Sequence, residues 1–224
     1  MIRRSSATSS DTVLRVEKLG VSIAAMRILR DVSLEVPSGS MVGLIGRNGA
    51  GKTTLMKAVM GLLKASGGRA EFDGVDLLKI PTHQRARLGI GYMPEDRRLI
   101  PDLTVEENVL VPAWAAALPD APARLRKIYE YIPEMTELAP RKGLQLSGGQ
   151  QKLAALARAL MCGTRLLLLD EPFEGVAPAL AQRLAEVVAS LKREGMSVML
   201  SESDLQHSER LVDRVVTIDR GAIA

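Results

Sequence analysis

The stretch Met41-Val-Gly-Leu-Ile-Gly-Arg-Asn-Gly-Ala-Gly-Lys-Thr-Thr54 decides the fold of this chain. Residues 41–45 are an apolar run with the length of a buried strand, residues 46–51 are glycine-rich, and Lys52 opens a segment with apolar residues at helical spacing. The pattern Gly46-x-x-x-x-Gly51-Lys52-Thr53 is therefore a P-loop in the strand–loop–helix context that supports it. The sequence predicts a site for a nucleoside triphosphate.

Each residue type in this loop has a physical reason. Glycines let backbone N–H groups curl around phosphate oxygens, and the start of the following helix adds a partial positive charge. We expect Lys52 to neutralise the β- and γ-phosphates and the Thr53 hydroxyl to coordinate Mg²⁺. A glycine-rich turn that matches by chance is the alternative. The predicted nucleotide contacts in this loop are Gly46, Arg47, Asn48, Gly49, Ala50, Gly51, Lys52, Thr53 and Thr54.

Composition sets outer bounds on the function. The chain has 224 residues, of which 46% are hydrophobic and 25% charged, the profile of a globular protein that buries a sizeable core. The net charge of +4 is spread without a long basic run, and the aromatic content of 3% argues against a stacking platform for single-stranded nucleic acid. We expect no nucleic-acid partner.

The compartment is indicated by what the sequence lacks. Cys162 is the only cysteine, which rules out a disulfide framework and favours a reducing compartment. No apolar stretch reaches the roughly 18 residues of a spanning helix, and the polar start lacks the apolar region of a signal peptide. We predict a disordered tail over residues 1–12 and a cytoplasmic protein.

The rest of the chain predicts an α/β fold with two additions. Residues 13–19 and 31–36 alternate apolar and polar residues, which indicates an antiparallel β layer before the P-loop strand. Between residues 95 and 145 six prolines break a region of helical composition, which indicates a helical subdomain inserted into the core. We predict further strands and helices that alternate, giving a parallel sheet covered on both faces. These elements are strands at 165–170, 196–201 and 215–219 and helices at 150–161, 178–194 and 205–213.

A second glycine motif lies at Leu146-Ser-Gly-Gly-Gln150, directly before a helix. The Ser147 hydroxyl can donate a hydrogen bond, Gly148 and Gly149 allow close backbone approach, and the helix dipole favours an anion. Taken alone, the motif is equally well read as a helix cap. Asp170-Glu171 follows at the end of the apolar strand and makes a phosphate contact the better interpretation.

These motifs together resemble the ATP-binding subunits of ATP-binding cassette (ABC) transporters. The Walker A loop 46–53, the signature 146–150 and the Walker B run 166–171 occur in that family's order and separation. The match runs from about residue 13 to 219. Three further stretches resemble the ATPase subunits of branched-chain amino acid importers and of related amide or urea systems. They are Tyr92-Met-Pro-Glu-Asp-Arg-Arg-Leu, Leu103-Thr-Val-Glu-Glu-Asn108 and Asp170-Glu-Pro-Phe-Glu-Gly-Val-Ala-Pro178.

The resemblance implies an ABC ATPase fold over residues 13–224 and a role for each motif. Asp170 would bind Mg²⁺, and Glu171 would polarise the attacking water. Ser147, Gly148, Gly149 and Gln150 would contact the γ-phosphate of ATP held by a second ATPase subunit in a head-to-tail dimer. It also implies permease subunits as partners, indirectly a solute-binding protein, and a place on the inner face of the cell membrane.

Three positions depart from the general family pattern. Glu95 stands where a glutamine is usual and would still approach Mg²⁺ and the nucleotide, whereas Ile23 stands where an aromatic residue would stack on adenine. Ser203 replaces the histidine that senses the γ-phosphate, so it can offer a hydrogen bond but no charge. The alternative function is therefore a catalytically weak, nucleotide-gated half of a heterodimeric pair. A P-loop kinase or GTPase would leave residues 146–150 unexplained.

Overall fold

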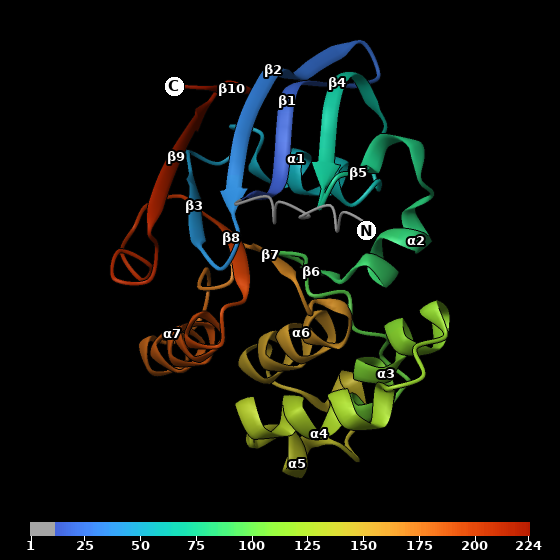
Figure 1. Ribbon diagram of the computed structural model, residues 1–224. Helices are drawn as coiled ribbons and strands as arrows, with labels where there is room; N and C mark the ends of the chain where they lie inside the picture. The colour runs from blue at the N-terminus through green and yellow to red at the C-terminus, as the bar shows by residue number, and fades with distance from the viewer. Residues whose placement is uncertain (1–11) are drawn as a thin grey trace, which may run out of the picture.

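Two β-sheets and a group of helices form the part of the chain that the computed structural model describes, residues 12–224 (Figure 1). The first sheet has the order β2-β1-β4-β5 and is antiparallel, and the second has the order β10-β9-β3-β8-β7-β6. The strands are β1 (Thr12–Ile23), β2 (Met26–Pro37), β3 (Met41–Ile45), β4 (Ala65–Phe72), β5 (Val75–Asp76), β6 (Ile90–Met93), β7 (Leu166–Asp170), β8 (Ser197–Glu202), β9 (Arg214–Asp219) and β10 (Ala222–Ile223).

The second sheet is the centre of the molecule. Strands β9, β3, β8, β7 and β6 are parallel, and β10 pairs antiparallel with β9 at the edge. Successive residues of β7 face opposite sides: Leu166 and Leu168 pack with the antiparallel sheet, and Leu167 and Leu169 pack with the helices. Both faces are therefore covered, which is why the first four residues of this strand are all leucine.

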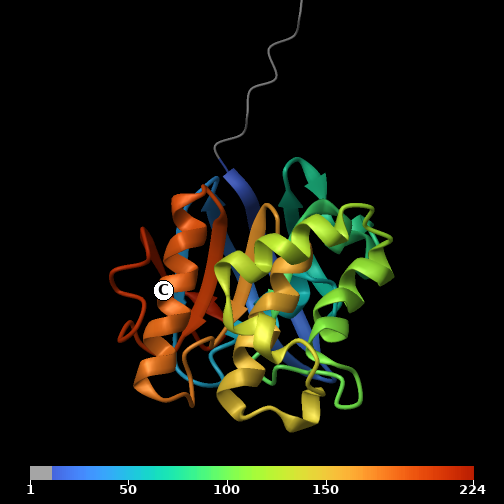
Figure 2. The same ribbon diagram turned by 90° about the horizontal axis from the view of Figure 1, so that it is seen from below.

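The helices divide between the two faces. Figure 2, seen from below, shows α3 to α7 in front of the central sheet, with α1 on its far side. In Figure 1, α3, α4 and α5 gather below α6 at the end farthest from the antiparallel sheet. The α-helices are α1 (Lys52–Val59), α2 (Thr82–Arg85), α3 (Val105–Ala116), α4 (Ala121–Tyr131), α5 (Glu134–Leu138), α6 (Gly148–Cys162) and α7 (Pro178–Arg193).

The predicted fold class, a P-loop α/β core with an antiparallel β layer and added helices, is confirmed. The division into a core and a subdomain over residues 95–145 stays a prediction. Of the predicted tail, residues 1–11 lie outside the described residues, and Thr12 is the first residue of β1.

The helix predicted over residues 205–213 is wrong, because that segment forms a series of turns. Polar side chains there bind locally rather than leaving the backbone to pair with itself. The Asp204 carboxylate accepts from the Gln206 N–H at 2.9 Å, and the Ser208 hydroxyl donates to the Glu202 carboxylate. The amphipathic spacing was present, but these contacts favour turns.

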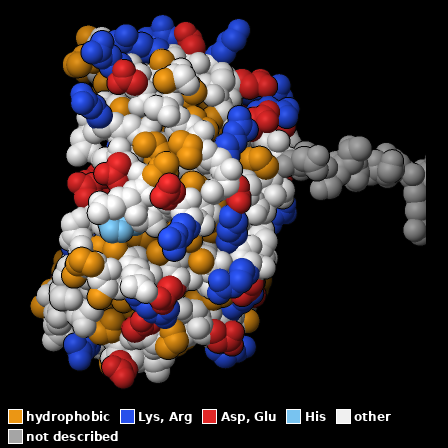
Figure 3. All heavy atoms as spheres, turned by 90° about the vertical axis from the view of Figure 1, so that its left-hand side faces the viewer, with side chains coloured by type: hydrophobic (Ala, Val, Ile, Leu, Met, Phe, Trp, Pro, Cys, Tyr) orange, Lys and Arg blue, Asp and Glu red, His pale blue; other side chains and the backbone are white. Residues whose placement is uncertain are grey.

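Charge on the surface is mixed. Figure 3 shows the side of the molecule that carries β9 and α7, where basic, acidic and hydrophobic side chains are interspersed. This face carries no single-sign patch, in agreement with the spread of charge in the sequence.

Candidate active site

The P-loop connects the end of β3 to the start of α1, and two of its glycines are required by geometry. A Cβ on Gly46 would lie 2.3 Å from the main-chain oxygen of Ile218. Gly51 has φ +112°, a conformation that residues with side chains rarely adopt. The loop is therefore a tight turn that delivers Lys52 and Thr53 to the first turn of α1.

Lys52 and Glu171 form a buried ion pair. The Lys52 ammonium lies 2.9 Å from Glu171 Oε1, and the two side chains are 3% and 7% exposed. The same ammonium donates to the main-chain oxygen of Gly46 at 2.5 Å. A buried charge needs both a counter-charge and hydrogen bonds, and this pair provides them.

Asp170 ends β7 and is fully buried among hydroxyl donors. Thr53 Oγ1 donates to Oδ1 at 3.1 Å, Ser201 Oγ donates to Oδ1 at 2.8 Å, and the Tyr92 hydroxyl donates to Oδ2 at 3.1 Å. Burial raises the pKa of Asp170 above its usual value, although the three donors oppose this. Burial, together with the Asp170 charge, raises the pKa of Tyr92, so the phenol keeps its proton.

Glu171 has an unusual backbone for a residue with a side chain, with φ +49°. Its N–H donates to Ser201 Oγ at 3.1 Å, and its main-chain oxygen accepts from the Lys152 ammonium at 2.7 Å. Contacts on both sides thus hold this residue at the point where β7 turns away from the sheet.

A pocket of about 420 Å³ joins these groups to the positions predicted for the rest of the nucleotide. Its lining combines the P-loop with four positions outside it, Ile23 from β1, Ile28 from β2, Glu95 from the segment after β6 and Glu171. Ile23 is 46% exposed and so presents an apolar side chain to this space. The other lining residues are Asn48, Gly49, Gly51, Lys52, Thr53 and Thr54.

A neighbouring pocket of about 560 Å³ lies on the other side of the loop and holds the remaining P-loop positions, Gly46, Arg47 and Ala50, with Ser203. The Ser203 hydroxyl donates to Asn48 Oδ1 at 3.0 Å. The residue predicted to sense the γ-phosphate is therefore placed against the P-loop.

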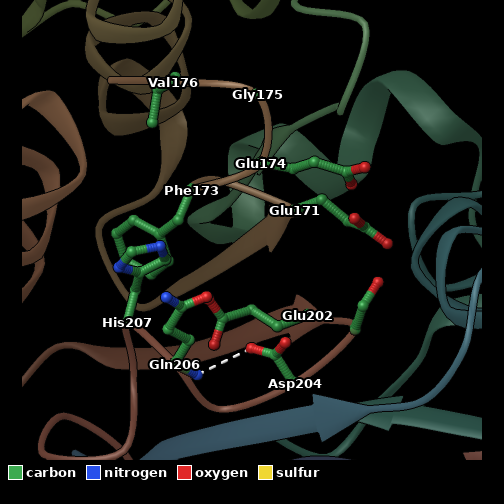
Figure 4. Close-up of a pocket in the computed structure, with 10 residues that line it drawn as sticks. Glu171, Phe173, Glu174, Gly175, Val176, Glu202, Asp204, Gln206 and His207 are labelled. Carbon is green, nitrogen blue, oxygen red and sulfur yellow. Dashed lines mark hydrogen bonds between the residues drawn. The ribbon is translucent and has the colours of Figure 1, made fainter. Parts of the chain in front are cut away.

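A third pocket, of about 300 Å³, lies beyond Glu171, and four of its ten lining residues are acidic (Figure 4). In Figure 4 the Glu171 side chain points away from His207, whose ring lies beside that of Phe173 with centroids 5.8 Å apart. Burial raises the pKa of Glu202 to about 7, against the hydrogen bond from Ser208. This pocket therefore holds a carboxyl group that titrates near neutral pH.

The signature residues lie apart from these three pockets. Ser147 caps α6: its Oγ accepts from the Gln150 N–H at 3.3 Å, and Gln150 Oε1 accepts from the Ser147 N–H at 3.0 Å. Both Ser147 and Gly148 are exposed. Within one chain the motif acts as a helix cap, and the exposed Ser147 hydroxyl can still donate one hydrogen bond.

The residues predicted to hold Mg²⁺ suit that ion. A carboxylate and a hydroxyl, those of Asp170 and Thr53, lie within hydrogen-bond distance, and Mg²⁺ prefers oxygen ligands. Among residues 12–224 no group of three or more acidic, histidine or cysteine side chains could hold a metal ion. Glu95, the third residue predicted to hold Mg²⁺, lines the same pocket as Thr53.

Comparison with known proteins identifies the family. The family model described as "ABC transporter" matches residues 29–174. The chain belongs to the ABC transporter family. This ABC subunit is 36% identical over 211 residues to the high-affinity branched-chain amino acid transport ATP-binding protein BraG of Pseudomonas aeruginosa, covering 94% of this chain and 91% of BraG. It is 33% identical to the lipopolysaccharide export system ATP-binding protein LptB of Haemophilus influenzae, covering 95% of this chain and 89% of LptB.

Solved structures agree with this assignment. A nucleotide-free ATP-binding cassette from an ABC transporter matches with a TM-score of 0.82 at 29% identity, covering 95% of this chain and 89% of that one. The protein is thus the ATP-binding subunit of an ABC transporter and a transport-coupled ATP hydrolase. None of the helices described over residues 12–224 is long and apolar enough to cross a membrane.

Three residues of this site escaped the sequence prediction. Tyr92 and Ser201 donate to Asp170, and Lys152 donates to the main chain of Glu171. A signal existed for two of them. Ser201 is a polar residue in a buried strand, and Lys152 lies one helical turn before the buried Leu156, on the apolar face of α6.

Proposed function

We propose that this subunit binds and hydrolyses Mg·ATP at composite sites in a head-to-tail dimer and so drives an importer for branched-chain amino acids or related small solutes. The observation that carries the proposal is the cluster of Lys52, Thr53, Asp170 and Glu171, of which Lys52, Thr53 and Glu171 line the 420 Å³ pocket and Asp170 lies behind Thr53. It combines a cation for phosphate, oxygen ligands for Mg²⁺ and a carboxylate for water in one place.

The residues suggest how the chemistry proceeds. Phosphate oxygens compete with the Glu171 carboxylate for the Lys52 ammonium, because phosphate and carboxylate are both anions and Lys52 is the cation that Glu171 binds. When Lys52 turns to the β- and γ-phosphates, the Glu171 carboxylate becomes free to accept a proton from the attacking water. Bound Mg²⁺, held by Thr53 and Asp170, would neutralise phosphate charge.

The signature is the second half of each composite site. Its exposed start, with the Ser147 hydroxyl and free backbone N–H groups at the N-terminus of α6, suits a γ-phosphate presented by a partner subunit. Gly148, Gly149 and Gln150 would contribute there by close backbone approach. Ile23 would contact the adenine through apolar surface alone, and Ser203 would offer a hydrogen bond in place of a charged histidine.

The mass of the Glu171→Gln variant with Mg·ATP, measured by light scattering, tests this proposal. Removing the carboxylate should block hydrolysis and leave binding intact, so the expected result is a nucleotide-dependent doubling of mass. Glu186→Gln, an exposed carboxyl on α7, is the matched control and should not dimerise stably. A variant that binds ATP but stays monomeric would contradict the homodimer and favour the catalytically weak half of a heterodimer.

The transported solute is proposed from the relatives. BraG is named for branched-chain amino acids, and LptB is named for lipopolysaccharide export. The motifs around Tyr92 and Leu103 favour the importer, with permease subunits and a solute-binding protein as partners and a place on the inner face of the cell membrane. Uptake of labelled leucine should fall when Glu171→Gln replaces the native subunit in cells. Unchanged uptake of leucine, amides and urea would contradict the importer.

A further inference from the structure

Lys152 is a buried cation whose hydrogen-bond partners are main-chain carbonyls. It lies in the second turn of α6 and is 2% exposed. Its ammonium donates to the main-chain oxygens of Glu171 at 2.7 Å, Pro172 at 3.1 Å and Glu174 at 2.6 Å. These bonds use all three N–H donors, which is the condition for keeping an ammonium away from water.

The bonds fix the residue on which hydrolysis depends. Glu171 has φ +49°, which is unfavourable for a residue with a Cβ unless its surroundings hold it. Ser201 accepts from its N–H, and Lys152 donates to its carbonyl oxygen. Without Lys152 the carbonyl side of this strained residue, and the turn that follows, would lose its three-point anchor.

The same side chain joins two functional segments of the subunit. Lys152 belongs to the helix that the signature begins, whereas Glu171 to Glu174 belong to the turn after Walker B. A Cβ on Gly149 would lie 2.6 Å from Leu180 Cδ2, so the first turn of α6 also packs against the first turn of α7. The signature helix cannot shift without acting on the segment between Glu171 and α7.

In a head-to-tail dimer these two segments serve different ATP molecules, because the signature of one subunit completes the site of its partner. We propose that Lys152 is a positioning residue that fixes the Glu171–Glu174 backbone and transmits the position of the signature helix to Glu171 of the same subunit. The coupling of two ATP sites rests on the proposed function, whereas the positioning of Glu171 does not.

Charged groups around Lys152 are consistent with this role. Burial lowers the pKa of Lys152 to about 8, and the nearby Arg97 acts in the same direction, while Glu171 and Glu95 oppose it. Burial thus disfavours the charged form of Lys152, whereas the three carbonyl acceptors stabilise its ammonium. A purely structural role would account for the burial of Lys152. It would not account for acceptors that all lie in the Glu171–Glu174 backbone.

Hydrogen exchange tests the positioning without any need for activity. In Lys152→Met the amides of Glu171, Phe173 and Glu174 should exchange at least about tenfold faster than in wild type. The control is Arg124→Met, which removes a cation that donates to the Met161 carbonyl at 3.0 Å, at the far end of the same helix. Exchange at residues 171–174 that is the same in wild type and Lys152→Met overturns the proposal.

Steady-state kinetics test the coupling. Lys152→Met should lower kcat at least about tenfold with the affinity for ATP within about twofold, and the Hill coefficient for ATP should fall toward 1. Lys152→Gln keeps two N–H donors and should recover part of kcat, which also covers the case in which the Met variant folds poorly. A Hill coefficient above 1 that survives in both variants overturns the coupling. A wild-type chain without ATPase activity would instead refute the proposed function, and the exchange experiment would still decide the positioning.

Discussion

At the carboxyl ends of β3 and β7 the charged side chains are buried and paired with one another, whereas at the start of α6 the signature residues Ser147 and Gly148 are exposed, and Ser147 bonds only to its own helix. Lys52 and Glu171 neutralise each other, and Asp170 accepts three hydroxyl donors. Ser147 and Gln150 exchange capping hydrogen bonds. One half of the site is complete within the chain, and the other half presents its polar groups outward.

This difference has an energetic origin. Burying charges stabilises a protein only when they are fully paired, so the P-loop side tolerates few substitutions. The signature side is solvated, so its residues contribute little beyond capping until another molecule desolvates them. Substitutions on the two sides should therefore separate effects on chemistry from effects on folding.

The largest effect is expected from Glu171→Gln. Loss of the general base should lower the ATPase rate about 100- to 10,000-fold. Nucleotide binding should change little, because the Lys52 ammonium no longer pairs with a carboxylate and remains available to phosphate. The measurement is phosphate release together with equilibrium nucleotide binding, with Glu186→Gln as the control at the wild-type rate. A rate loss below about tenfold would show that another group activates the water.

A pair of substitutions at Ser147 separates the cap from the phosphate contact. Ser147→Ala removes the cap and should lower the free energy of unfolding by about 1 kcal/mol. Ser147→Asp keeps an equally good cap but places a carboxylate where a γ-phosphate is expected, so stability should hold while ATPase activity falls at least about tenfold. Urea unfolding and phosphate release provide the two readouts. An Asp variant with the wild-type rate would reduce the motif to a helix cap.

The P-loop side shows how far sequence reasoning reaches. The glycine spacing and the apolar run before Asp170 are local patterns, and they predicted the strand, the loop and the helix where the structure has them. The register of β7 and β8, which sets Asp170 beside Ser201, depends on pairing between segments far apart in sequence. Tyr92 on β6 reaches Asp170 through the same kind of long-range pairing, with β7, and for that reason neither Ser201 nor Tyr92 was predicted as a donor to Asp170.

Local competition explains the other failure. The segment at 205–213 has helical spacing, but the side chains of Asp204 and Ser208 bind nearby groups and favour turns. Lys152 was missed for the opposite reason, because a lysine in an amphipathic helix is ordinarily assigned to the solvated face. Its acceptors are carbonyls of a turn 19 to 22 residues away.

Glu202 extends the comparison to pH, as a buried acid that no cation neutralises within its pocket. Its pKa is raised to about 7 in the folded protein from 4.5, so the folded state binds the extra proton between these values. The stability that this proton confers is present below pH 4.5 and is lost as pH rises to about 7, a change of up to about 3 kcal/mol.

Glu202→Gln tests this directly. The amide cannot ionise, so the contribution of this position to the free energy of unfolding should become independent of pH between about 4.5 and 7. Urea unfolding at several pH values gives the slope for the variant and for wild type. Equal slopes in the two proteins would show that Glu202 is not the group that titrates.

The smallest effect is expected from Ser203→His, which changes a residue beside the P-loop. Ser203 donates to Asn48 in the P-loop and cannot supply charge, whereas a histidine could place a partly protonated imidazole near the γ-phosphate. The single-site ATPase rate should rise about fivefold. This corresponds to a lowering of the activation free energy by about 1 kcal/mol. Ser203→Ala separates the loss of the Asn48 contact from the gain of an imidazole, and should change the rate less than twofold. A histidine variant within about twofold of wild type would mean that Lys52 and Mg²⁺ already neutralise the phosphate, so that the buried half of the site needs no further cation.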